Sequence, residues 1–137
     1  MPSIEDAEKL TRIFGEWPSF HDAEVLRLLL DRSGPEAPTI EAEIHVFGAT
    51  SEVDAAGHYA LTRHTLVTLR FTQVALVDLG GFNQQNVLFD LKIEELAPDT
   101  HDGRGWSVQM NPSYGVGASF ECRRAVVAGV KPYVAAA

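Results

Sequence analysis

The chain has very little cysteine and no long hydrophobic run. Cys122 is the only cysteine among its 137 residues, which excludes an intramolecular disulfide, a zinc ribbon and a CxxC redox site. The most apolar stretches, such as residues 25–30, are broken by charge within a few residues and are far shorter than the roughly 20 residues of a transmembrane helix. The first residues include Glu5 and Asp6 and lack the apolar segment of a signal peptide. We therefore expect a cytoplasmic protein that does not insert into membranes.

Recognisable catalytic and metal-binding motifs are also lacking. None of the five histidines has a histidine four residues away, so His45, His58 and His64 would form a zinc site only if the fold brought them together. No serine stands in the G-x-S-x-G pattern of a hydrolase, and Gly115–Gly117 has too few glycines for a phosphate-binding loop. We therefore expect no enzyme activity, no metal and no cofactor.

Positive charge is scarce in the first half of the chain. Residues 1–62 contain 12 acidic and 4 basic residues, whereas residues 63–137 contain 7 of each, and the net charge is −8. An acidic surface repels nucleic-acid phosphates and attracts basic proteins or cations. The charge therefore disfavours nucleic-acid binding and favours a basic protein partner, with simple solubility as the alternative explanation.

The first residues show the pattern of an amphipathic helix. Ser3 and Asp6 resemble an N-cap with an acidic third position, and apolar residues then recur at helical spacing from Ala7 to Phe14 before Gly15 ends the run. This pattern predicts one helix over residues 3–14, packed on the rest of the chain by Leu10, Ile13 and Phe14.

The rest of the chain alternates between apolar and polar residues, which is typical of strands with one buried face. Strands are predicted over residues 24–32, 39–47, 64–71, 74–79, 87–96, 106–110 and 116–130, the last as one strand or two, with residues 48–63 as a long loop. The other connections are short and no crossover helix separates the strands, so the pairing should be antiparallel. We expect a single α+β domain over residues 1–137: one N-terminal helix packed on a largely antiparallel β-sheet of consecutive hairpins. Leu26, Leu28 and Leu30 are expected on one face of the first strand, and Cys122 in the core.

Two clusters of polar residues are candidate sites. His21 and Asp22 place an imidazole beside a carboxylate, a pair that could serve a base or a metal ligand. In an extended segment, however, adjacent side chains point to opposite faces, and the structural interpretation is that one of them caps a turn and bonds to backbone. The run of four amides, Asn83, Gln84, Gln85 and Asn86, could bind a partner's backbone or could satisfy strand ends within the fold. A small enzyme or ligand-binding domain built on both clusters remains an alternative.

Four segments resemble proteins of the immunity protein 50 family: residues 17–24, 64–71, 81–86 and 115–122. The resemblance implies a non-enzymatic α+β protein that binds and blocks a toxin domain. It transfers no individual functional residue to this chain. A subunit that self-associates through its sheet edges is a third possibility, which would make the protein a homo-oligomer.

Strand alternation turns Glu41 and Glu43 away from the core, on the face opposite Ile40, Ala42 and Ile44. Together with the acidic first half, this predicts that Glu41 and Glu43 lie at the centre of a surface for a basic partner, such as a basic toxin domain. The four amides are the second candidate for that surface.

Overall fold

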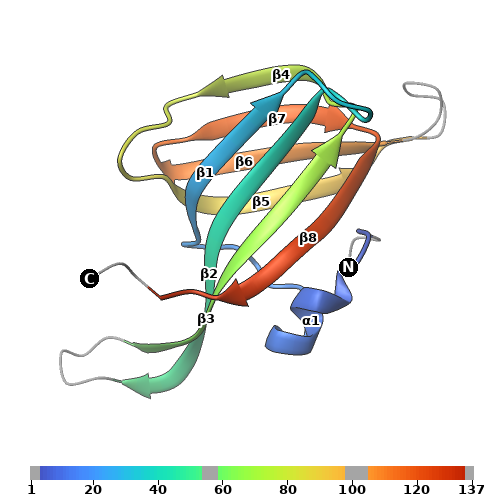
Figure 1. Ribbon diagram of the computed structural model, residues 1–137. Coiled ribbons are helices and arrows are strands. Elements are labelled where there is room, and N and C mark those ends of the chain that lie inside the picture. Colours follow the sequence, from blue (N-terminus) through green and yellow to red (C-terminus); the bar gives the residue numbers. More distant parts are fainter. Residues whose placement is uncertain (1–3, 54–58, 98–104, 135–137) are drawn as a thin grey trace.

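A computed structural model describes residues 4–53, 59–97 and 105–134. They form one helix, α1 (Glu8–Phe14), followed by eight strands (Figure 1). The strands are β1 (Glu24–Asp31), β2 (Thr39–Val53), β3 (Tyr59–Thr72), β4 (Ala75–Gly80), β5 (Val87–Glu95), β6 (Trp106–Tyr114), β7 (Gly117–Cys122) and β8 (Arg124–Pro132). No helix in the described segments is long and apolar enough to cross a membrane.

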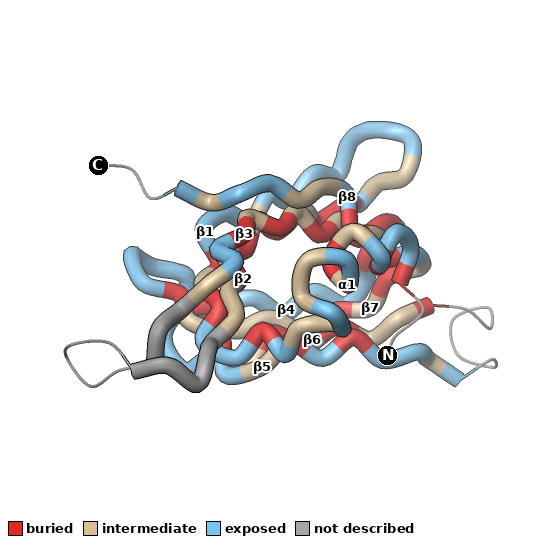
Figure 2. Tube along the Cα trace, turned by 90° about the horizontal axis from the view of Figure 1, so that it is seen from below, coloured by how far each residue is buried: buried red, intermediate tan, exposed pale blue. Residues whose placement is uncertain are grey.

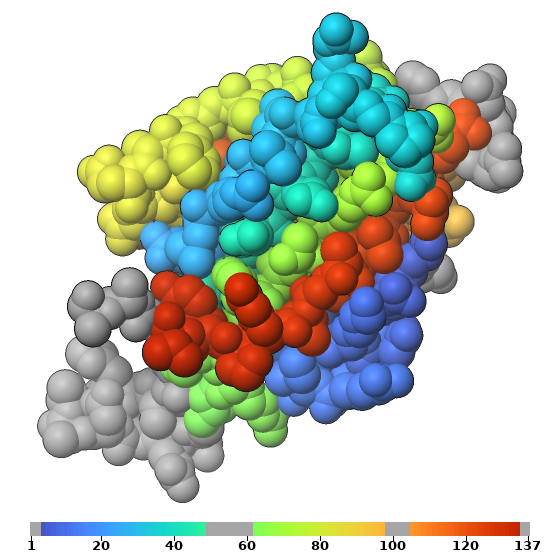
Figure 3. All heavy atoms as spheres, viewed as in Figure 1, coloured from blue at the N-terminus to red at the C-terminus, as the bar shows by residue number. Residues whose placement is uncertain are grey.

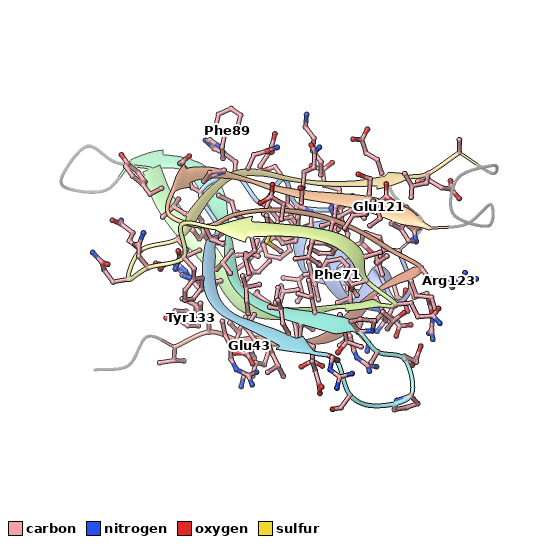
Figure 4. The ribbon with its side chains drawn as sticks, turned by 90° about the horizontal axis from the view of Figure 1, so that it is seen from above. Glu43, Phe71, Phe89, Glu121, Arg123 and Tyr133 are labelled. Atoms are coloured by element: carbon pink, nitrogen blue, oxygen red, sulfur yellow. The ribbon has the colours of Figure 1, made fainter. Side chains whose placement is uncertain are left out.

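The eight strands make one sheet in the order β4-β7-β6-β5-β1-β2-β3-β8, and every strand pair is antiparallel. The sheet bends sharply between β5 and β1, where Glu24 and Val87 are the only strand residues in register. It thereby folds into two layers, β4-β7-β6-β5 and β1-β2-β3-β8, with side chains such as Phe71 between them (Figure 4). The predicted α+β class, with one N-terminal helix and a largely antiparallel sheet, is confirmed.

The buried side chains form one cluster between the layers. β2 and β3 supply its centre, because Ala42, Ile44, Val67 and Leu69 alternate with outward polar residues and are almost fully buried. Cys122 is buried in the same cluster, as predicted. Because inward residues come from both layers, the two halves of the sheet stabilise each other by burying a shared apolar surface.

α1 begins later than predicted. Asp6 has a left-handed φ of 59°, which is incompatible with a helix, and the cap residue is Ala7 without any side-chain hydrogen bond. Ser3 lies outside the described residues, and Ile4 and Glu5 instead run along β8. Leu10 is fully buried, and Figure 2 shows α1 lying across the lower opening between the two layers. The helix therefore closes one end of the core.

The prediction of a long loop over residues 48–63 is wrong for most of that segment. β2 continues to Val53 and β3 begins at Tyr59, with Gly48 opposite Thr62; only residues 54–58 lie outside the described chain. This part of the hairpin extends below the two layers (Figure 1). Residues 48–63 show no regular alternation of apolar and polar residues, so the sequence pattern gave no signal for this backbone pairing.

Two further strand predictions need correction. The register of β1 shifts between Val25 and Arg27, so Val25 is buried and Leu26 is exposed, contrary to the predicted face. The cause is a β-bulge, which inserts an extra residue and reverses the alternation. β6 continues to Tyr114 through the segment that was predicted to turn after residue 110. The last segment forms two strands, β7 and β8, which was one of the two predicted possibilities.

Candidate partner-binding surface

The amide turn, residues 83–86, is held by its own asparagine side chains. The Oδ1 atom of Asn86 accepts hydrogen bonds from the backbone N–H groups of Asn83 (3.0 Å) and Val116 (3.1 Å). Its Nδ2 atom donates to the carbonyl oxygen of Asn83 at 2.7 Å. Asn86 is buried. Two of its three hydrogen bonds close the turn on Asn83, and the third joins the turn to Val116, directly before β7.

Asn83 makes a second set of local bonds. Its Oδ1 atom accepts from the N–H group of Gln85 (2.9 Å), and its Nδ2 atom donates to the carbonyl oxygen of Gly81 (2.9 Å). The side chains of Gln84 and Gln85 are exposed and make no hydrogen bond with any described residue. The turn thus divides its amides: the asparagines shape it, and the glutamines are open to a partner.

His21 and Asp22 lie in an exposed turn before β1. His21 Nδ1 donates a hydrogen bond to the carbonyl oxygen of Phe89 (2.8 Å), and the two rings meet edge to face at 5.5 Å. His21 Nε2 is 3.6 Å from Asp22 Oδ1. The expectation that these side chains point to opposite faces is wrong, because Asp22 has a left-handed φ of 66° and the segment is not extended.

The hydrogen bond from His21 to the backbone of Phe89 agrees with the structural interpretation, in which one residue of this pair bonds to backbone. Neither His21 nor Asp22 borders the cavity between β1 and β4 or the one between α1 and β8. The pair therefore fixes the β1 entry against β5 and lines none of the cavities described for residues 4–53, 59–97 and 105–134.

Glu41 and Glu43 lie on the outer face of β2, and each has an arginine on the neighbouring strand. Glu43 Oε1 is 3.3 Å from Arg27 Nη1 of β1, and Glu41 Oε1 is 3.8 Å from Arg70 Nε of β3. Both glutamates are half-buried. Such cross-strand pairs at a wet surface contribute at most about 1 kcal/mol each, but they partly neutralise the two carboxylates.

A second ion-pair group joins distant parts of the chain. The guanidinium of Arg124 donates to both carboxylate oxygens of Glu5 and to Glu36, each at 2.8 Å. These hydrogen bonds hold the pKa of Glu5 below its usual value and raise the pKa of Arg124. Acids from the first half of the sequence are thus matched with arginines from the second half. The charge split of the sequence does not persist as a purely acidic face here.

Sequence reasoning missed an aromatic cluster at the lower end of the same face. His45 Nε2 and His64 Nδ1 are hydrogen-bonded at 2.9 Å, and the ring of Tyr133 stacks on His45 at a centroid distance of 4.1 Å. Phe47 contacts both histidine rings. Burial, and then the neighbouring His64, lower the pKa of His45, against a smaller opposing effect of Glu24. Strand alternation could have placed His45 on this outer face, but not beside Tyr133.

These histidines do not assemble a metal site in the described part of the chain. His58 lies outside it, and no group of three or more His, Cys, Asp or Glu side chains converges among residues 4–53, 59–97 and 105–134. A hydrogen bond between two imidazoles needs one ring to donate and the other to accept. The hydrogen bond between His45 and His64 therefore links β2 to β3.

Comparison with known proteins agrees with the resemblance of the four segments. The family model of immunity protein 50 matches residues 6–133, which include α1 and all eight strands. No curated protein and no solved structure matches the chain. Members of the matching family are non-enzymatic toxin inhibitors. Because the match covers nearly the whole chain, this protein belongs to the immunity protein 50 family.

Proposed function

We propose that this protein neutralises a cognate toxin by binding to it as a folded, non-enzymatic inhibitor. The family match over residues 6–133 carries the proposal. The arrangement of the candidate residues supports it, because the polar groups singled out from the sequence lie on turns and open strand faces rather than around a substrate pocket. A cytoplasmic location, expected from the sequence, is part of the proposal.

The toxin-facing surface includes Glu41 and Glu43 on β2 and the turn of residues 83–86. A net charge of −8 favours a basic toxin domain, and charges near an interface act mainly on the rate of encounter. Since Arg27 and Arg70 already pair with the two glutamates, a basic residue of the toxin would share these carboxylates rather than meet free ones. We therefore assign them to steering and assign Gln84 and Gln85 to polar contacts at the edge.

The steering role can be tested without disturbing the fold. Glu41→Gln and Glu43→Gln keep the shape of the side chains, whereas lysines would face Arg70 and Arg27. The double glutamine variant should slow association with the toxin domain about 10-fold at low salt and much less at high salt. Glu94→Gln, at an exposed position on β5 of the other layer, is the matched control. If the association rate changes neither in the double variant nor with ionic strength, Glu41 and Glu43 are not part of the toxin-facing surface.

The function itself can be tested by co-expression. A toxin domain found in the neighbourhood of this gene is produced in a host cell with and without the chain, and growth is followed. We expect growth arrest by the toxin alone and recovery when the chain is present. An unrelated toxin domain of the same size is the control. If the chain restores no growth while both proteins are produced, it is not the inhibitor of that toxin.

A further inference from the structure

The two edge strands of the sheet, β8 and β4, differ in whether another described segment pairs with their outer side. At β8, the N-terminal segment adds a short parallel bridge: the N–H group of Glu5 donates to Ala125 O (3.1 Å), and the N–H group of Val127 donates to Glu5 O (2.9 Å). At the other edge, β4 pairs with β7 on one side only. No described segment pairs with its outer side, and all six of its residues are exposed.

Apolar side chains gather along this open edge. Most of the exposed large hydrophobic residues of the described chain lie on β1, on β4 or directly after β4. They are Leu26, Leu29 and Leu30 of β1, Leu76, Val77 and Leu79 of β4, and Phe82. Leu76 is 69% exposed and Leu30 is 49% exposed. A concentration of this kind on a folded surface marks an interaction site.

A cavity between β1 and β4 leads from this edge of the sheet toward the core. Leu28 and Leu30 of β1 and Val77 and Leu79 of β4 line an apolar cavity that reaches Phe120. A second cavity of about 190 Å³ lies beside it; Leu30 and Val77 line this cavity too, and Asp31 and Arg32 also border it. Figure 3 shows the atoms of β4 alongside those of β1 on this face. We call this feature the β1–β4 groove.

The wall of the groove on the β1 side is also an unpaired strand edge. β1 pairs with β2 along its length, whereas β5 meets it only at Glu24. The last backbone bond on that side joins the N–H group of Val25 to the carbonyl oxygen of Asn86 in the amide turn (2.8 Å). Beyond Val25, β1 and β4 therefore present two strand edges to one apolar groove.

We propose that the β1–β4 groove receives an extended strand of the cognate toxin, which pairs with the free edge of β4. Only an extended backbone satisfies the row of N–H and C=O groups of an edge strand, and apolar side chains of that strand would fill the groove. A bulge between Ala75 and Asp78 distorts the first half of β4. Pairing is therefore expected at residues 78–80.

Charge decides between a toxin strand and a second copy of this chain. Two copies each carry a net charge of −8 and repel one another, whereas a basic toxin is attracted. Asp78 on β4 adds local negative charge, whereas the charges of Asp31 and Arg32 beside the groove offset one another. The groove also adjoins the steering residues, because Leu29 of β1 lies opposite Glu41 of β2. Acidic residues would then guide the toxin toward an apolar anchor.

This inference rests on the proposed function, and hydrogen–deuterium exchange tests it directly. The probe is the toxin domain identified by co-expression. In the complex, those backbone amides of residues 78–80 that point away from β7 should exchange at least about 10-fold more slowly than in the free chain. Val77→Lys and Leu30→Lys, one in each wall, should raise the Kd by about 30-fold. Phe89→Lys, an equally exposed residue on β5 away from the groove, should change it by less than about 3-fold.

The possible outcomes distinguish a failure of the β1–β4 groove as the binding site from a failure of the proposed function. If the toxin is bound and neutralised, but exchange at β4 is unchanged and the groove variants bind like Phe89→Lys, the groove is not the site and the function stands. If β4 is already protected in a free chain of dimer mass, the occupant is a second copy and the inference is wrong. If the unaltered chain does not bind the toxin, the proposed function fails and the inference fails with it. Unfolding curves of each variant identify any loss of fold.

Discussion

Asn86 should be one of the most sensitive polar positions of the molecule. The change Asn86→Ala removes the acceptor of the Val116 N–H group, which lies at a fully buried residue. A buried donor without a partner costs about 1–3 kcal/mol, and the lost bond from Nδ2 to the carbonyl oxygen of Asn83 adds about 1 kcal/mol. The N–H group of Asn83 is near solvent and can bind water instead. We therefore expect the free energy of unfolding to fall by about 3 kcal/mol.

Urea and thermal unfolding measure this effect. The unfolding entropy scales with length to about 0.3 kcal/mol/K for 137 residues, so the melting temperature should fall by about 10 °C. Gln84→Ala is the matched control, because its exposed side chain makes no hydrogen bond with any described residue; its effect should stay within about 0.5 kcal/mol. Equal stabilities of the two variants would refute the argument that the asparagines shape the turn, and would return Asn86 to the list of binding residues.

Three other predictions concern stability and reactivity. Gly115→Ala should cost at least about 2 kcal/mol in urea unfolding, because Gly115 has a φ of 78° and an added Cβ would collide with Gln85 O and with Asn86 Oδ1; a neutral result would contradict the turn geometry. The lowered pKa of His45 means that the unfolded chain binds protons more readily than the fold does. Stability should therefore be complete above about pH 6.5 and fall as the pH drops below that value, less so in His45→Gln; identical pH profiles would exclude this role. Burial raises the pKa of Cys122 to about 12, so iodoacetamide at pH 8 should label it only as fast as the protein unfolds, and rapid labelling of the native state would show that the thiol is accessible.

The sequence predicted the fold best where burial is alternating. Ile40, Ala42 and Ile44 give β2 a regular apolar face, and the same pattern located β3 and β5. Prediction failed where the backbone departs from that pattern. The bulge at Leu26 turns that residue outward and buries Val25 instead, although Leu28 and Leu30 keep the predicted inward face. The distal β2–β3 hairpin is held by backbone pairing that carries no apolar period. The predicted start of α1 was wrong because Glu5 pairs with Val126 of β8, a contact between residues far apart in sequence.

The candidate surface was harder to predict, because it depends on which strands become neighbours. Glu41 and Glu43 were correctly expected to point outward, but their arginine partners come from β1 and β3. The hydrogen bond between Arg124 and Glu5 joins residues 119 positions apart, so no local sequence pattern could predict it. The position of β4 at the edge of the sheet could not be predicted either. The sequence pattern shows which residues of a strand are apolar, but not which strands become its neighbours. Whether Glu41, Glu43 and the glutamines contact a toxin stays a prediction.

Titration of the toxin's activity with the purified chain tests the central claim most directly. A non-enzymatic inhibitor acts only while bound, so the activity of the toxin domain identified by co-expression should fall linearly and reach its minimum at one chain per toxin. A stable complex of the same stoichiometry should appear by size-exclusion chromatography with light scattering. Loss of activity at a small fraction of an equivalent would reveal an enzyme. Full activity at a large excess of the chain would contradict the assignment of this toxin as its partner.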